Sequence, residues 1–111
     1  MRVLGYTKKW SKLQKEVHTT FRFTRKDKDW YTGEYVQEVY HPRSKDREII
    51  NPKCLIIEKR NLFCKSITDE EAIEDGFESA IDMRNWLVKA HDLVRVKFEV
   101  IHKLTIKIVN E

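Results

Sequence analysis

The sequence contains few of the residues that cross-link or interrupt a chain. Its 111 residues include two cysteines, two prolines and three glycines. Cys54 and Cys64 match neither the ligand spacing of a metal site nor a disulfide framework, so we expect two semi-buried thiols. The sequence therefore argues against a scaffold held by zinc or disulfides, and it suggests no metal and no cofactor.

Long hydrophobic runs are also missing. The longest uninterrupted apolar run is three residues, Leu55 to Ile57, which is too short to span a membrane. Residues 1–9 lack the apolar central region of a signal peptide, so we expect a cytoplasmic protein without membrane contact. A composition of 41% hydrophobic and 36% charged residues predicts one globular domain over residues 1–111, with a monomer favoured.

Charge is unevenly distributed along the chain. Residues 1–60 hold 15 lysines and arginines against 8 acidic residues, whereas residues 61–111 hold 7 against 10. The basic half suits an anionic partner such as nucleic acid or a nucleotide. Two other interpretations stay open: the basic face is merely solvated, or the dense Lys/Glu surface is a heat-stability trait of a thermophile.

The most informative segment is residues 17–24, where β-branched and aromatic residues predict a strand. Successive side chains of a strand point to opposite faces. One face carries an apolar row that should face the core, namely Val17, Thr19, Phe21 and Phe23. The other face carries a polar row that faces either water or a cleft, namely His18, Thr20, Arg22 and Thr24.

The neighbouring segments predict more strands and one short helix. Residues 8–16 favour a helix that Thr7 caps. Lys8, Lys12 and Lys15 share the face opposite its apolar residues and should place their ammonium groups near His18 and Arg22. After a polar turn, Trp30 and Tyr31 either stack on a base or close one end of a barrel. Further strands are expected at residues 35–41, 53–60 and 61–67, with a charged loop at residues 43–48.

The second half of the chain predicts helices and a closing strand. Thr68 and Glu71 form a capping-box pattern, and Gly76 predicts a break before a longer helix that ends near His91. From Val94 onward the apolar residues alternate to position 108, which predicts one bent strand or two strands joined by a bulge. The element order indicates an α+β fold, a small mixed β-barrel with two or three flanking helices.

Four segments give the chain a likeness to a known family. They are Thr19-Thr20-Phe21-Arg22, Gly33-Glu34, the segment from Ile67 to Phe77 and the segment from Val94 to Val100. In this order, residues 8–101 resemble the ASCH domains of the PUA-like superfamily. The resemblance implies a PUA-like barrel with helices beside it, and a cleft that in relatives binds RNA or a modified nucleoside.

The signature of that family is partly present. It reads Gly-x-Lys-x-x-Glu-x-Arg, often with Thr replacing the Glu. Its Arg falls on Arg22 and its Thr on Thr20, whereas Val17 stands at its Lys and Lys15 at its Gly. Some members hydrolyse N4-acetylcytidine with a Lys, a Thr and a carboxylate, and the resemblance implies Asp75 as the carboxylate.

Our first functional hypothesis is an RNA- or nucleotide-binding module with a basic cleft beside the strand. Phosphate contacts from lysines and arginines would make the affinity salt-dependent, and an aromatic side chain could stack on an unpaired base. Asp75 is expected either to orient Arg22 or to cap the helix after Gly76. The residues expected to bind nucleic acid are Lys12, Lys15, His18, Thr20, Arg22, Trp30 and Tyr31.

Two alternatives stay open, and the sequence does not decide whether the protein is an enzyme. One is a small amidohydrolase acting on an N4-acylated cytidine-type nucleoside. Its catalytic residues would be Thr20 as nucleophile or water-orienting hydroxyl, Lys15 or His18 as base, and Asp75 as acid partner. The other is a protein-interaction domain whose charged surface serves solubility.

Overall fold

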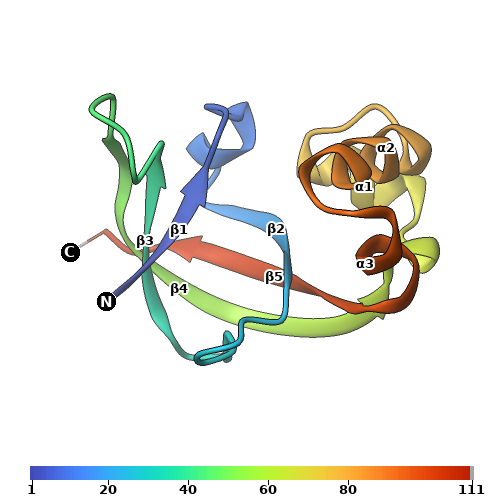
Figure 1. The fold of residues 1–111 in the computed structure, drawn as a ribbon. Helices are drawn as coiled ribbons and strands as arrows, with labels where there is room; N and C mark the ends of the chain where they lie inside the picture. Colours follow the sequence, from blue (N-terminus) through green and yellow to red (C-terminus); the bar gives the residue numbers. More distant parts are fainter. Residues whose placement is uncertain (111) are drawn as a thin grey trace.

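The computed structural model describes residues 1–110 as an α+β fold with a curled five-stranded sheet and three α-helices (Figure 1). The strand order is β1-β3-β4-β5-β2, in which β1 and β3 are parallel and every other pair is antiparallel. The strands are β1 (Arg2–Tyr6), β2 (Val17–Phe23), β3 (Tyr35–Tyr40), β4 (Glu48–Phe63) and β5 (Val100–Ile108).

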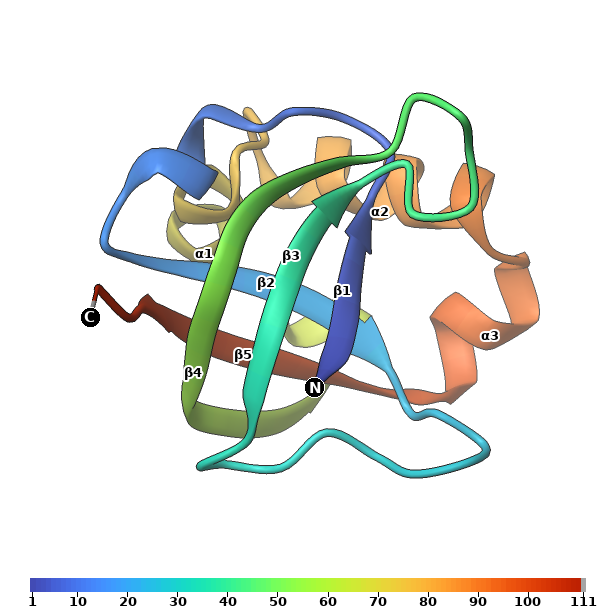
Figure 2. The ribbon, with the colours of Figure 1, turned by 90° about the vertical axis from the view of Figure 1, so that its left-hand side faces the viewer.

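The sheet curls into a half-barrel whose two ends, β1 and β2, are not paired with each other (Figure 2). We call the space between these two strands the open seam. The strands β4 and β5 continue past the barrel and run beneath the helices (Figure 1). The helices are α1 (Asp69–Asp75), α2 (Ala80–Ala90) and α3 (Leu93–Phe98), with 3₁₀ turns η1 (Ser11–Gln14) and η2 (Cys64–Ser66).

The start and end of α1 confirm the expected signals. Thr68 accepts a bond from the backbone N–H of Glu71, and the Glu71 side chain accepts one from the Thr68 backbone, which completes a capping box. Gly76 ends the helix with φ +110°, a left-handed conformation that favours glycine. Asp75 is the last residue of α1 and does not cap the next helix, because Ser79 caps α2.

The expected strand from Val94 to Val100 is wrong at its beginning. Residues 93–98 form α3, which Asp92 caps by accepting a bond from the backbone N–H of Arg95. The strand β5 begins only at Val100. In a helix, only residues three or four positions apart lie on the same face. Alternate residues therefore do not share a buried face: Val96 is buried, while Val94 and Phe98 are exposed.

The two strands expected at residues 53–60 and 61–67 are one strand. β4 begins at Glu48, inside the predicted charged loop, and continues to Phe63, where η2 follows. Pro52 lies within it, where the pairing with β3 is irregular between Val36 and Glu38. A proline lacks a backbone N–H, and a break in the ladder is where a strand tolerates that loss.

The helix expected at residues 8–16 is also wrong in its extent. Only η1 forms there, Trp10 precedes it in extended conformation, and no side chain caps it, so Thr7 has no capping role. The tighter turn places Lys12 inside the molecule rather than on the exposed face with Lys8 and Lys15. The sequence also gave no expectation of β1, whose hydrogen-bonded partner β3 lies 34 residues away in register.

The strand β2 separates two hydrophobic clusters. One packs between the sheet and the helices, and includes Phe21, Phe23, Ala72, Met83 and Leu87. The other fills the half-barrel, and includes Leu4, Leu13, Val36, Ile56 and Leu104. Both faces of β2 are therefore covered. Of the polar row that was expected to face water or a cleft, His18 is buried, Thr20 and Arg22 line a cavity described below, and Thr24 is exposed. Val17, assigned to the core, is 47% exposed.

Both cysteines are free thiols, and they are fully buried where semi-buried thiols were expected. Burial raises the pKa of each thiol above its ordinary value. Low thiolate content at neutral pH makes a nucleophilic role for either residue unfavourable.

Candidate functional site

Arg22 bridges the open seam. Its Nη2 donates to the backbone carbonyl of Gly5 on β1 at 2.9 Å, and its Nε donates to Thr20 Oγ1 at 3.1 Å. The guanidinium carbon lies 4.8 Å from the centre of the Tyr6 ring. Both bonding partners of Arg22 are uncharged, so the seam holds a positive charge without a carboxylate bound to it.

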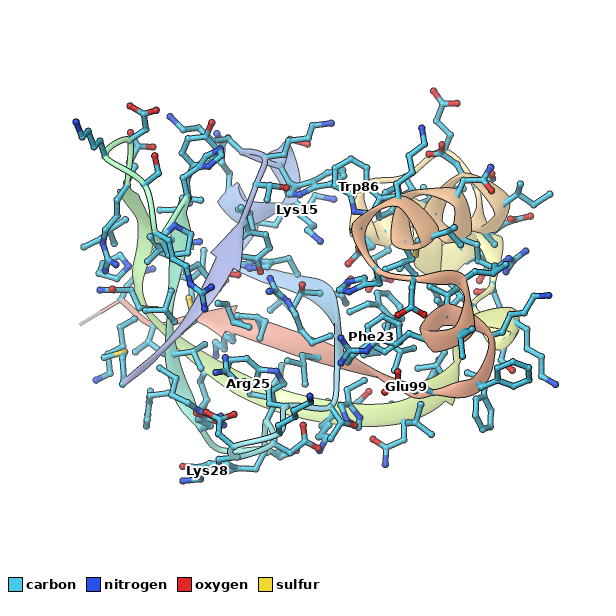
Figure 3. All side chains as sticks on the ribbon, viewed as in Figure 1. Lys15, Phe23, Arg25, Lys28, Trp86 and Glu99 are labelled. Carbon is cyan, nitrogen blue, oxygen red and sulfur yellow. The ribbon has the colours of Figure 1, made fainter. Side chains whose placement is uncertain are left out.

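One cavity lies on the helix side of Arg22, and we call it the aromatic cavity. Its volume is about 350 Å³, and its polar lining includes Lys12, Thr20, Arg22 and Asp75. Three aromatic rings from separate segments pack against one another in its wall. The ring centres of Trp10 and Phe77 lie 5.0 Å apart, those of Trp10 and Trp86 5.6 Å apart. Trp86 reaches from α2 toward the N-terminal segment (Figure 3).

A buried ion pair forms the polar part of this wall. Lys12 Nζ donates to Asp75 Oδ1 at 2.8 Å, and Thr19 Oγ1 donates to the same oxygen at 3.1 Å. Burial lowers the pKa of Lys12, and burial raises the pKa of Asp75. Buried ionisable groups with shifted pKa values are common where a side chain exchanges protons or contacts a ligand.

Asp75 does not orient Arg22 through a hydrogen bond. The sequence suggested that these two side chains would pair, but Asp75 bonds Lys12 and Thr19, and Arg22 bonds Thr20 and Gly5. The cause is the inward position of Lys12, which supplies the nearer cation. Lys12, Thr20, Arg22 and Asp75 are nevertheless brought together in one cavity.

Lys15 and His18, both expected at the site, do not line the aromatic cavity. Lys15 is exposed, and the His18 side chain is completely buried. His18 Nε2 lies 2.8 Å from Glu38 Oε1, and His18 Nδ1 lies 2.9 Å from the Lys15 carbonyl oxygen. These two contacts hold the imidazole inside the half-barrel, away from the aromatic cavity.

The Glu38 carboxylate lies inside the half-barrel and accepts hydrogen bonds from several side chains. Its carboxylate accepts from Tyr6 Oη at 2.6 Å and from Asn51 Nδ2 at 2.8 Å, in addition to His18. Burial alone would raise the pKa of Glu38, but these bonds outweigh burial and hold the pKa below its ordinary value. This network fixes Tyr6, whose ring also lines both cavities.

A second cavity lies on the other side of Arg22, and we call it the arginine cavity. Its volume is about 770 Å³. It is bordered by the N-terminal strand, the residues after β2 and the loop after β3. Its charged or titratable lining residues are Arg2, Arg22, Arg25, Asp27, His41 and Arg43.

The two expected stacking residues differ in position. Trp30 is buried and lines the arginine cavity, with the Arg2 guanidinium 4.4 Å above its ring centre. Tyr31 is 47% exposed and lines neither cavity. Trp30 therefore belongs to the barrel wall, in line with the second of the two interpretations given for it.

The aromatic walls were not foreseen as part of a site. Tyr6, Trp10, Phe77 and Trp86 come from four separate segments, and only the fold brings them together. One signal was available: a tryptophan, Trp86, lies in the helix predicted after Gly76, and tryptophan is enriched among residues that dominate binding.

Comparison with known proteins gives no match. No family model matches the chain, and no curated protein or solved structure is similar enough to count as a match. Within residues 1–110, no helix is long and apolar enough to cross a membrane. The same residues contain no group of three or more His, Cys, Asp or Glu side chains that could hold a metal ion.

Proposed function

We propose that the protein binds a nucleotide unit of RNA, or a modified nucleoside, in the aromatic cavity. The observation that carries this proposal is the combination of aromatic walls with polar side chains that include Lys12, Thr20, Arg22 and Asp75. Small-ligand sites are typically concave, of about 300–1,000 Å³, and mostly apolar with a few convergent polar groups. A flat heterocycle with hydrogen-bonding edges fits such walls.

The charge at the open seam supports an anionic ligand. Arg22 has only neutral hydrogen-bonding partners, and the N-terminal half of the chain is basic. Lys8 adds positive charge beside the aromatic cavity, because its Nζ lies 4.3 Å from the Trp10 ring centre. Phosphate contacts made by such groups dominate affinity for RNA.

The finer fold assignment belongs to the same proposal. The resemblance to PUA-like ASCH domains implies a small β-barrel with helices beside it and a cleft, and we extend the proposal to that fold for the curled half-barrel and its helices. It is supported by the sequence segments around Thr20, Gly33 and Gly76. An interaction domain is less well supported, because that alternative requires an exposed row, whereas His18 and Thr20 are buried.

The proposal is tested by replacing the most accessible wall of the aromatic cavity. Trp86 is 40% exposed, so Trp86→Leu should leave the fold intact while removing a stacking surface worth about 1–3 kcal/mol per base. Binding of short single-stranded RNAs and of cytidine is measured by calorimetry or fluorescence. Leu93→Ala, on the exposed face of α3 and outside both cavities, is the matched apolar control.

A specific observation favours a second candidate function, the hydrolysis of an N4-acylated cytidine. The lowered pKa of Lys12 would make its amine available as a base in the cavity that contains the Thr20 hydroxyl. In this scheme Thr20 Oγ attacks the acyl carbonyl, Lys12 takes its proton, and protonated Asp75 gives a proton to the departing amine. Water then releases the acyl group from Thr20.

This scheme replaces the bases first considered. Lys12 lies beside Asp75 in the cavity, whereas Lys15 is exposed and His18 is buried away from it. N4-acetylcytidine turnover is measured for the wild type and for Thr20→Val and Lys12→Met. Loss of turnover in both variants supports the enzyme, and turnover that survives in Thr20→Val removes the acyl-threonine step.

A further inference from the structure

The arginine cavity has a surplus of hydrogen-bond donors. Asp27 is the one carboxylate among its lining residues, and it is already paired with Arg25, whose Nε donates to Asp27 Oδ1 at 3.0 Å. Arg2 is likewise paired, since its Nη2 donates to Glu34 Oε1 at 2.6 Å. Arg22 and Arg43 are left without a carboxylate partner among residues 1–110.

A buried donor in the same wall has no partner. The indole nitrogen of Trp30 is buried, and no acceptor lies within hydrogen-bonding distance of it in residues 1–110. Trp30 as a whole is 3% exposed and lines the arginine cavity. Buried donors in folded proteins are almost always paired, but this nitrogen has no solvent exposure and does not face the open cavity, so Trp30 contributes an apolar wall beside the arginines.

The border of this cavity is firmly tied to β1. The His41 backbone N–H donates to the Tyr6 carbonyl at 2.9 Å, and His41 has φ +46°, a left-handed value that is uncommon for residues other than glycine. Gly5 lets this loop approach closely, because a Cβ at position 5 would lie 2.8 Å from Pro42 Cγ. Arg43 is thereby held at the cavity edge, while its side chain is exposed.

We propose that the arginine cavity is a phosphate subsite, so that the ligand of this protein is a nucleotide that reaches across Arg22 and not a free nucleoside. This inference rests on the proposed function, which assigns the base to the aromatic cavity. Arg22 lines both cavities and can therefore contact the sugar–phosphate link between them. Guanidinium groups suit phosphate oxygens because they donate two parallel bonds.

The test compares four probes on the intact protein: cytidine, cytidine 5′-monophosphate, cytidine 3′-monophosphate and the dinucleotide cytidylyl-(3′→5′)-cytidine. Inorganic phosphate serves as a fifth probe, followed by ³¹P NMR. We expect at least one phosphorylated probe to bind on the order of tenfold more tightly than cytidine, the range for hydrogen bonds to a charged group. The monoester and diester probes distinguish a terminal phosphate from an RNA backbone.

Arg43→Gln is the decisive variant because its exposed side chain has no structural bond to lose. It should remove most of the advantage of the phosphorylated probe and leave cytidine binding unchanged. Lys45→Gln is the matched control, since it removes one charge from the same loop outside both cavities.

The outcomes separate this inference from the proposed function. Equal affinities for cytidine and all phosphorylated probes would overturn the phosphate subsite. They would not contradict the proposed binding of the base in the aromatic cavity. Equal effects of Arg43→Gln and Lys45→Gln would also overturn it, because the effect would then be general charge. Phosphate binding lost in Arg43→Gln, with no cytidine binding and no effect of Trp86→Leu, would uphold the subsite and contradict the proposed function.

Discussion

At the scale of single residues, the Lys12–Asp75 pair is placed where it costs stability. Burial opposes the charge on both groups, and their attraction at 2.8 Å must offset that penalty. For the lysine, the lowered pKa means that its protonation opposes folding below the ordinary value of 10.5. For the aspartate, the raised pKa means that ionisation opposes folding above 3.8. A purely structural role does not account for such a pair.

The pair therefore predicts non-additive variants. Lys12→Met alone and Asp75→Asn alone should each lower the free energy of unfolding, by about 3 kcal/mol where a buried charge is left uncompensated. The double variant should fall within about 1 kcal/mol of the wild type, because no charge remains buried. Chemical denaturation measures all four proteins. Equal, additive losses would contradict this account of the pair.

Glu38 gives a prediction about pH. Its folded-state pKa is lowered, so the ionised carboxylate adds stability that is present above the ordinary value of 4.5 and is lost as the pH falls through the folded-state pKa. Glu38→Gln should cost about 3 kcal/mol at neutral pH, since it breaks the bond to His18. Denaturation midpoints measured from neutral pH to below 4.5 should show this deficit shrinking.

The control for that measurement is Glu58→Gln, an exposed acid on β4. It should change stability little at any pH. A Glu38→Gln deficit that stays constant across the whole pH range would mean that packing, and not the ionised carboxylate, is responsible.

At the scale of elements, Gly76 couples the end of α1 to the aromatic cavity. A Cβ at this position would lie 2.8 Å from Trp10 Cε3, and the left-handed φ of +110° adds strain for any other residue. Gly76→Ala should cost about 1–3 kcal/mol in stability from the backbone alone. It should also displace Trp10 and weaken cytidine or RNA binding.

Gly33→Ala is the control that separates these two effects. Gly33 has a similar φ of +95°, but no atom lies within 4 Å of the added Cβ. Both variants should unfold more easily, whereas only Gly76→Ala should lose ligand affinity. Equal ligand affinities in the two variants would show that Trp10 does not depend on Gly76.

Sequence patterns predicted some elements and not others for physical reasons. The strand at β2 and the capped start of α1 are local signals, carried by alternation and by the Thr68–Glu71 box, and both are confirmed. The strand prediction for residues 93–98 was wrong. It relied on the alternation of apolar residues and passed over Asp92, a helix-capping residue that favours a helix. The strand β1 is stabilised by a distant partner, which no local pattern reveals.

The site was predicted only in part, because local patterns identify some of its residues whereas others come together only in the folded chain. The residues along β2 and near Gly76 could be named from the chain alone, because the resemblance places them. Lys12 was assigned to the wrong face, since a 3₁₀ turn has three residues per turn and rotates side chains differently from the expected α-helix. The aromatic walls depend on tertiary contacts between four segments and could not be derived from any one of them.

At the scale of the whole molecule, the open seam connects charge distribution to function. The half-barrel leaves β1 and β2 unpaired, Arg22 reaches across them, and a cavity lies on each side. The basic N-terminal half of the chain builds this seam, while the acidic half contributes α1 and α2. An anionic ligand would therefore be steered toward the seam.

We expect Arg22 at the open seam to contact the anionic part of an RNA ligand. A salt titration of RNA binding measures this contact. Binding of a short single-stranded RNA is measured against salt concentration for the wild type, Arg22→Gln and Lys45→Gln. We expect Arg22→Gln to weaken binding and to reduce the slope of log affinity against log salt by about one, as for a lost phosphate contact. A slope that is unchanged in Arg22→Gln, or reduced equally in Lys45→Gln, would contradict the claim.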